Sequence, residues 1–299
     1  MSWLFQRLFS AALVIFSVTL VVFFLIHLIP GDPVDVMLGE TATVADRQAM
    51  RISLGLDQPL PVQLLDYLQG LFQLDFGQSL HSKEPISRIL AQRLPATARL
   101  ALSAMFIAMM LAIPLGIFSA VYKGSWIDRT AMLVSLAGLS IPNFLLGPLL
   151  VLVFSIALGL LPVSGNDSLL HLILPSITLG LSMAAVLARM VRSSLLETLG
   201  EDFIRTAHAK GMHPRDVIWK HAMRNAWLPV ITVIGAQIGA LLGGAVVTET
   251  VFDWPGLGSL MIESIQKRDY PIVQACVLII SVIYVVVNAL TDLCYGLLD

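Results

Sequence analysis

Residues 193–229, SSLLETLGEDFIRTAHAKGMHPRDVIWKHAMRNAWLP, form a polar stretch inside an otherwise strongly apolar part of the chain. The stretch is flanked by apolar segments at residues 172–191 and 228–251. Each flanking segment has close to the roughly 20 apolar residues that a helix needs to cross a bilayer. The polar stretch itself is too hydrophilic to cross one. The pattern therefore predicts two membrane-spanning helices joined by a segment exposed on one side of the membrane.

The same length criterion, applied outward from this stretch, predicts an all-α membrane protein with six transmembrane helices. The predicted spans are residues 8–29, 96–122, 131–161, 172–191, 228–251 and 272–295. Composition agrees, because 57% of the residues are hydrophobic and 13% are charged, against about 45–50% and about 25% in soluble domains. We therefore expect one membrane domain over residues 1–299, in contact with lipid. A formal net charge of −2 argues against nucleic acid as a partner.

The orientation follows from the positive charges in the connecting segments. Seven Lys and Arg residues lie between Arg189 and Arg224, and short loops rich in such residues stay in the cytoplasm. This rule places residues 193–227 and both termini on the cytoplasmic side. It places residues 30–95 and 252–271 outside. The first external segment is too long for a plain connection, so we expect it to fold. Residues 252–270 contain the aromatic turn Trp254-Pro255-Gly256, which predicts either the outer mouth of a pathway or an interfacial anchor.

Several kinds of chemistry have no support in the sequence. The cores of the predicted spans contain no Asp, Glu, Lys or Arg, which disfavours an ion-coupled carrier. There is no phosphate-binding loop and no zinc-binding HExxH motif. Ser140 and Ser182 have no mid-span histidine to activate them as nucleophiles. We therefore predict no catalytic residue, no metal site and no cofactor bound by this chain. A self-sufficient carrier or channel, and an intramembrane enzyme, remain the alternatives from other functional classes.

The polar stretch has its own helical pattern. Acidic Glu201 and Asp202 favour a helix start, and Phe203, Ile204 and Ala207 share one face of that helix. Gly211 after Lys210 is typical of a left-handed helix end. Pro214 is well placed to begin a second short helix, and Pro229 to begin the fifth span. Two short helices joined by a sharp turn would make a compact unit, which can pass on a displacement better than a flexible loop. A basic interfacial helix on anionic lipid is the alternative.

Two motifs in the stretch resemble the EAA loop of ATP-binding-cassette importer permeases, in the branch serving dipeptides, oligopeptides, glutathione and nickel. They are Arg205-Thr206-Ala207-x-Ala209-Lys210-Gly211 and His221-Ala222-x-Arg224-Asn225-Ala226-x-Leu228-Pro229. His208 departs from the Arg that this branch often has. Further segments resemble the branch along nearly the whole chain. These are Pro30-Gly31-Asp32-Pro33, Leu54-Gly55-Leu56-Asp57-Gln58-Pro59-Leu60, Asp75-Phe76-Gly77-x-Ser79, Arg93-Leu94-Pro95-Ala96-Thr97, Phe252-x-Trp254-Pro255-Gly256-Leu257-Gly258 and Arg268-Asp269-Tyr270-Pro271.

This resemblance implies a non-catalytic permease subunit in the inner membrane of a bacterium. It implies a heterodimer with a related second permease, two cytoplasmic ATPase subunits that carry ATP and Mg²⁺, and an external substrate-binding protein. The cargo would be a di- or oligopeptide, with nickel or glutathione as alternatives. The residues expected to contact an ATPase are Arg205, Thr206, Ala207, His208, Lys210 and Gly211. For Ala207 and Gly211, packing and helix capping alone remain the alternative.

Within the spans, the sequence offers packing residues and a few polar groups. Gly235, Gly239 and Gly243 repeat at four-residue spacing, which predicts close helix packing within the chain or with the second permease. Pro142 predicts a kink in the third span. The candidate pathway-lining residues are Asn143, Ser182 and Gln237. Each of these three could instead be hydrogen-bonded to a neighbouring helix.

Overall fold

The computed structural model describes residues 2–28, 34, 43–53 and 55–298, and within these ranges the regular elements are helices. The chain forms two compact units: residues 1–95 with 259–285, and residues 96–258 with 286–299. The motif Pro30-Gly31-Asp32-Pro33 and Leu54 lie outside the described residues.

Four helical segments are long and apolar enough to cross a membrane. They are Phe5–Phe24 of α1 (Ser2–Leu28), α5 (Ile86–Val121), α8 (Leu169–Leu199) and Tyr270–Leu293 of α13 (Tyr270–Leu298). Two bent helix pairs raise the count to as many as six among the described residues, if each pair is one span. The pairs are Trp126–Ser140 with Asn143–Ala157, and Pro214–Leu241 with Gly243–Val251, the second bent by 51°. The described part of the chain is therefore all-α, with four to six candidate spans.

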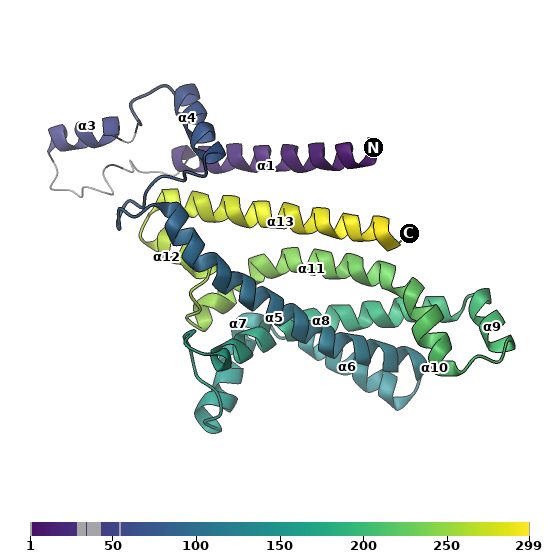
Figure 1. Cartoon of the computed structure of the whole chain (residues 1–299). Helices are drawn as coiled ribbons and strands as arrows, with labels where there is room; N and C mark the ends of the chain where they lie inside the picture. The colour runs from purple at the N-terminus through teal and green to yellow at the C-terminus, as the bar shows by residue number, and fades with distance from the viewer. Residues whose placement is uncertain (1, 29–33, 35–42, 54, 299) are drawn as a thin grey trace. The chain divides into compact units, whose positions relative to one another are not determined.

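The second unit is built around α8. This helix packs against α6 (Trp126–Ser140) and α11 (Met223–Val251), as Figure 1 shows. Helix α5 also approaches it closely, because a Cβ atom added at Gly180 would lie 2.9 Å from the Ala104 carbonyl oxygen. An alanine-rich core fills the contact between α5 and α8. Small side chains allow helices in a membrane to pack this tightly.

The predicted third span is broken rather than kinked. Helix α6 ends at Ser140, and α7 (Asn143–Leu150) leaves it at 101° before continuing into a π-helical turn, Val151–Ala157. Pro142 explains the break, because proline disfavours a helical conformation in the preceding residue. Ile141 is accordingly extended, with φ −90° and ψ 115°. The expectation of one helix over residues 131–161 was therefore wrong.

The expected second short helix and fifth span are continuous with each other. Helix α10 (Pro214–Asp216) leads into the π-helical segment η2 (Val217–Ala222) and then directly into α11. Pro229 lies inside α11 and does not begin it. No glycine or proline interrupts residues 215–228, and a proline is tolerated in a membrane helix where its surroundings satisfy the freed backbone group.

The first unit contains the long segment that precedes α5. It folds into α3 (Val44–Ser53) and α4 (Leu60–Phe72), followed by an isolated bridge between Gln78 and Pro85. Buried Asp269 accepts hydrogen bonds from the Ser79 hydroxyl at 2.6 Å and from the Leu80 amide at 3.1 Å. These bonds attach the segment to the residues that precede α13.

Candidate functional site

The polar stretch contains α9 (Asp202–Ala209), which ends in a Schellman motif. The Gly211 amide donates to the His208 carbonyl at 2.9 Å, and the Met212 amide donates to the Ala207 carbonyl at 3.3 Å. Gly211 has φ +75°, a left-handed conformation that glycine adopts without steric cost. The sequence prediction of a left-handed glycine at this helix end is confirmed.

Helix α9 has one face toward its own chain and one face outward. Ile204 and Ala207 are buried, whereas Phe203 is 40% exposed despite sharing their predicted face. The Ala207 side chain faces the core and fits the packing role that the sequence left open for it. The other candidate contact residues are exposed: Arg205, Thr206, His208, Lys210 and Gly211.

The base of α9 is held in the core of the second unit. Val217, Ala222 and Met223 are almost fully buried beside it. The Ser194 hydroxyl on α8 donates to the Ala226 carbonyl on α11 at 2.9 Å. We call α9, α10 and η2, together with the helix ends that support them, the coupling block (residues 191–226). Its core contacts connect α9 to both long helices.

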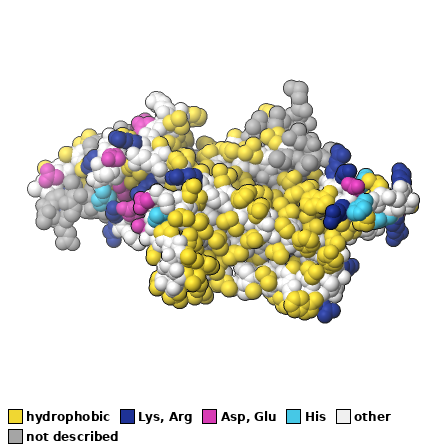
Figure 2. All heavy atoms as spheres, turned by 60° about the horizontal axis from the view of Figure 1, so that its bottom comes forward, with side chains coloured by type: hydrophobic (Ala, Val, Ile, Leu, Met, Phe, Trp, Pro, Cys, Tyr) yellow, Lys and Arg dark blue, Asp and Glu magenta, His cyan; other side chains and the backbone are white. Residues whose placement is uncertain are grey.

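The outer surface of the coupling block is rich in cationic and imidazole side chains. Figure 2 shows Lys, Arg and His side chains gathered at the end of the molecule that carries α9 and α10, beside hydrophobic surface. Arg205 lies 3.3 Å from Asp202, and Lys220 lies 2.9 Å from Asp216, in exposed pairs. Exposed ion pairs of this kind are weak because solvent screens them, so these side chains can exchange partners readily. This surface can therefore bind an acidic or mixed partner surface.

Two of the three candidate pathway residues are hydrogen-bonded within the chain. The Gln237 amide donates to the Met183 carbonyl at 3.0 Å, and the Ser182 hydroxyl donates to the Leu179 carbonyl at 2.9 Å. Asn143 differs, because its half-buried amide makes no hydrogen bond to the part of the chain that the structure describes. Its Nδ2 atom lies 3.9 Å from the position of a Cβ added at Gly244. Of the three, only Asn143 is left without a hydrogen bond by the described residues.

The two ends of the glycine repeat on α11 differ in how closely other atoms approach them. A Cβ added at Gly235 would lie 2.2 Å from the Thr291 hydroxyl oxygen, so glycine allows this close approach. A Cβ added at Gly243 would meet nothing within 4 Å among the described residues. Gly235 thus has a packing role inside the chain. The described residues make no such close contact with Gly243, and Gly239 lies between the two on the same helix.

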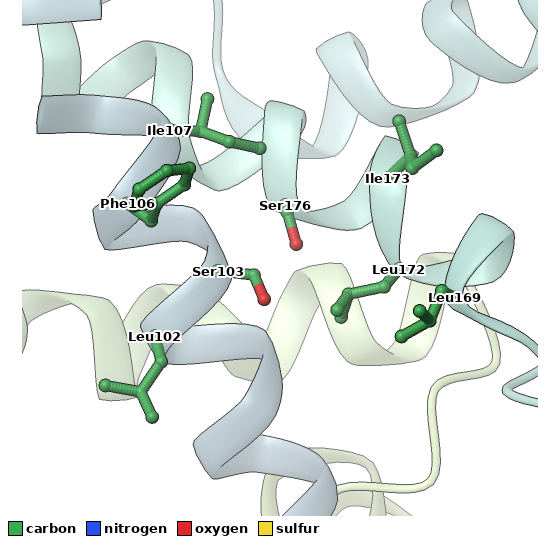
Figure 3. A pocket seen from close by; sticks show the side chains of 8 residues that line it. All are labelled: Leu102, Ser103, Phe106, Ile107, Leu169, Leu172, Ile173 and Ser176. Atoms are coloured by element: carbon green, nitrogen blue, oxygen red, sulfur yellow. The ribbon is translucent and has the colours of Figure 1, made fainter. Parts of the chain in front are cut away.

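An open groove of about 350 Å³ separates α5 from the beginning of α8, as Figure 3 shows. Its walls are mainly apolar, and two hydroxyls, from Ser103 and Ser176, face the space between the helices. The Ser176 hydroxyl is buried and has no hydrogen-bond partner among the described residues. None of the three sequence-predicted pathway residues lines this groove. Among the described residues, no group of three or more His, Cys, Asp or Glu side chains could hold a metal ion.

Sequence reasoning missed two buried carboxylates that organise the second unit. Glu249 accepts hydrogen bonds from the Thr97 hydroxyl at 2.7 Å and the Gly258 amide at 2.7 Å. Asp128 accepts from Arg192. The only sequence signal was that a charged residue lies close to the end of an apolar span, where a charge needs a partner.

Trp254 was also assigned to the wrong environment. It is 2% exposed, and its indole N–H donates to the Ala96 carbonyl at 2.9 Å. It is therefore neither an exposed mouth residue nor an interfacial anchor, but a core side chain that ties the end of α11 to α5. A tryptophan is stable there because the indole N–H finds an acceptor.

Residues 112–299 match the family described as "Binding-protein-dependent transport system inner membrane component", and residues 1–101 match its N-terminal counterpart. The chain is 43% identical to the glutathione transport system permease protein GsiC of Pectobacterium atrosepticum, over 100% of this chain and 98% of that protein. It is 42% identical to GsiC of Escherichia coli K12 over the same shares.

Two solved transporters are similar in fold. The methionine ABC transporter MetNI matches with a TM-score of 0.61 and 20% identity, over 72% of this chain and 99% of that chain. An amino acid ABC transporter matches with a TM-score of 0.54 and 18% identity, over 70% and 94%. At these identities the likeness concerns the fold alone.

Proposed function

Because the chain belongs to the family of binding-protein-dependent transport system inner membrane components, we propose that it forms half of the pore of an ATP-driven importer. It is a multi-pass inner membrane permease of the type that serves peptides, glutathione and nickel. Such permeases work with a partner permease, ATPases and a binding protein. The finer proposal is six spans with both termini in the cytoplasm. In it, each bent helix pair is one span, and the coupling block faces the ATPases.

The observation that carries the proposal is the exposed face of α9. Ile204 and Ala207 anchor this short helix to the core, while Arg205 and His208 point away from it. A helix held this firmly, with an exposed polar face, suits docking to another protein. We therefore propose that Arg205, Thr206, His208, Lys210 and Gly211 contact a partner ATPase. ATP and Mg²⁺ would be bound, and ATP hydrolysed, on that partner.

The proposed cargo is glutathione or a short peptide. The support is the similarity to GsiC proteins along the whole chain. Glutathione is itself a small peptide-like molecule, so the two proposals share their chemistry. Nickel has weaker support, because the described residues contain no cluster of candidate metal ligands. The external binding protein would contribute to selection among these solutes.

The test is purification of the tagged chain in mild detergent, followed by mass spectrometry of the proteins that remain bound. The proposal predicts a second six-span permease and an ATPase. The purified complex, reconstituted with its binding protein and with ATP inside the vesicles, should take up glutathione or a dipeptide. Uptake by the isolated chain without ATP would instead establish an autonomous carrier.

A charge reversal tests the docking face directly. Arg205→Glu should reduce recovery of the ATPase, because it reverses the charge at the centre of the exposed face. Arg129→Glu is the matched control, since Arg129 is an exposed arginine on α6 outside the coupling block. Equal ATPase recovery with both variants would contradict the docking assignment.

A further inference from the structure

A partly buried ion pair joins α6 to the end of α8 that belongs to the coupling block. Arg192 donates from Nε to Asp128 Oδ1 at 2.7 Å and from Nη2 to Asp128 Oδ2 at 2.8 Å. Asp128 is 5% exposed and also accepts from the Ser119 hydroxyl and, at 2.9 Å, from the Gly124 amide. A two-pronged arginine–carboxylate contact fixes orientation as well as distance. We call this pair the clamp.

The clamp connects the first turn of α6 to the part of α8 that packs in one core with α9. Asp128 lies in the first turn of α6, just after the turn that follows α5. Arg192 lies on α8 between Val191 and Leu195, which share a core with Ile204 of α9. A displacement of α9 is therefore transmitted through this core to the helix segment that carries Arg192.

Other contacts between α6 and α8 are less directional. A Cβ added at Gly138 would lie 3.6 Å from the Leu181 carbonyl oxygen and 3.7 Å from the Ala185 Cβ, which is ordinary van der Waals contact. Such contacts between small side chains permit one helix to slide along another. The clamp resists sliding, because its two hydrogen bonds hold one guanidinium edge against one carboxylate.

The far end of α6 is the sharp bend before Asn143, the proposed pathway residue. We propose that the Asp128–Arg192 clamp is a positioning element of the transport cycle: it makes α6, and with it the bend at Ile141–Pro142, follow the movements of the coupling block. This inference rests on the proposed function. It assigns to both residues a role in coupling ATP hydrolysis to solute movement, without contact to ATP or solute.

The test compares Asp128→Asn, Arg192→Gln and the double variant in the reconstituted complex with its binding protein. Asparagine keeps the shape of the side chain and an acceptor for the Gly124 amide, so it removes the charge pair selectively. Three quantities are measured: the amount of complex recovered from a given amount of membrane, the ATP hydrolysed per complex, and the solute transported per ATP hydrolysed. We expect each single variant to transport at least about tenfold less solute per ATP, since the loss of a charged hydrogen-bonded pair is worth at least one factor of ten.

The double variant should transport no less than the single variants, because residues that act as one pair have non-additive effects. Lys267→Gln is the control, since it removes an exposed pair with Glu263 (2.6 Å), outside the second unit. Its ratio of solute to ATP should equal that of the wild-type complex.

Three outcomes would overturn the clamp proposal. These are wild-type ratios of solute to ATP in both single variants, a loss that appears only as less complex per membrane, and losses that multiply in the double variant. Absence of ATP-dependent uptake by the wild-type complex would refute the proposed function, and the clamp proposal with it. Wild-type uptake with unaffected single variants would refute the clamp alone.

Discussion

The Thr97 hydroxyl donates a hydrogen bond of 2.7 Å to Glu249 Oε1, and the same hydroxyl oxygen accepts from the Leu257 amide at 2.8 Å. One side chain on α5 thus connects the end of α11 to the start of α12 (Leu257–Gln266). Glu249 is fully buried. Burying a carboxylate costs folding free energy unless it is hydrogen-bonded. This contact therefore stabilises the junction of α5 with the end of α11 and the start of α12.

Thr97→Val keeps the volume of the side chain and removes both hydrogen bonds. We expect it to lower the free energy of unfolding by about 1.5–3 kcal/mol, the usual value for a hydrogen bond to a charged group. The measurement is the unfolding midpoint of the purified protein in a denaturing detergent. Thr250→Val is the matched control, because the Thr250 hydroxyl is exposed and donates to the Val246 carbonyl of its own helix. Equal midpoints for the two variants would contradict this assignment.

Gly211→Asp should abolish ATP-coupled uptake while the protein still inserts into the membrane. The left-handed conformation at φ +75° costs a residue with a Cβ about 1–2 kcal/mol. A negative charge at the end of α9 also opposes the helix dipole. Gly211→Asn should have a milder effect, since it adds no charge and asparagine tolerates this conformation.

The Gly211 variants are measured by uptake per inserted protein, with Gly138→Ala as the control at a glycine with no positive φ and with ordinary contacts. Undiminished ATP-coupled uptake by Gly211→Asp would count against the role assigned to the coupling block.

Features set by local sequence were predictable from the chain alone. The apolar segments and the left-handed turn at Gly211 each follow from a few neighbouring residues. The early start of α5 at Ile86 was missed, because hydropathy marks the apolar part of a helix and not its polar extension. Pro142 indicated a kink, but the sequence did not give the size of the bend, which depends on how α7 packs.

The buried polar contacts could not be predicted in the same way. Thr97 and Glu249 are 152 residues apart in the sequence, and Asp128 and Arg192 are 64 apart. Each residue alone reads as a polar group near a helix end. Their pairing depends on how the helices pack, which no local pattern contains. For the same reason, Ala207 was expected at a partner surface although its side chain faces the core.

Gly235→Ala should destabilise the protein because the new methyl group would overlap Thr291. Overpacking of this kind typically costs about 1–3 kcal/mol, which exceeds the gain of about 1 kcal/mol in helix propensity. Thr291→Ala in the same chain should restore part of the loss, since it removes the two nearest atoms. The unfolding midpoint measures both effects. Gly243→Ala is the control and should be neutral or stabilising, because its surroundings are open.

Burial raises the pKa of Tyr67 to about 12, and its ring lies 5.6 Å from that of Phe23 in the first unit. An unfolded tyrosine titrates near pH 10. The folded state therefore holds this proton more tightly, and its stabilising effect is complete below about pH 10. The effect is lost as the pH rises from about 10 to about 12.

Tyr67→Phe allows this titration to be isolated from those of the other tyrosines. The difference in phenolate absorbance between the wild-type protein and the variant should titrate near pH 12. A difference midpoint near pH 10 would show that Tyr67 is not buried in solution.

Asn143→Ala should raise the KM for solute uptake without reducing the amount of assembled complex. The reason is that the Asn143 amide makes no hydrogen bond within the described part of the chain and lies at the bend between α6 and α7. Loss of one hydrogen bond to an uncharged group of the solute is worth about 0.5–1.5 kcal/mol, or about two- to tenfold in KM. Ser182→Ala is the control, because that hydroxyl is already bonded to the Leu179 carbonyl at 2.9 Å. An unchanged KM for Asn143→Ala, or an equal rise for Ser182→Ala, would remove Asn143 from the pathway.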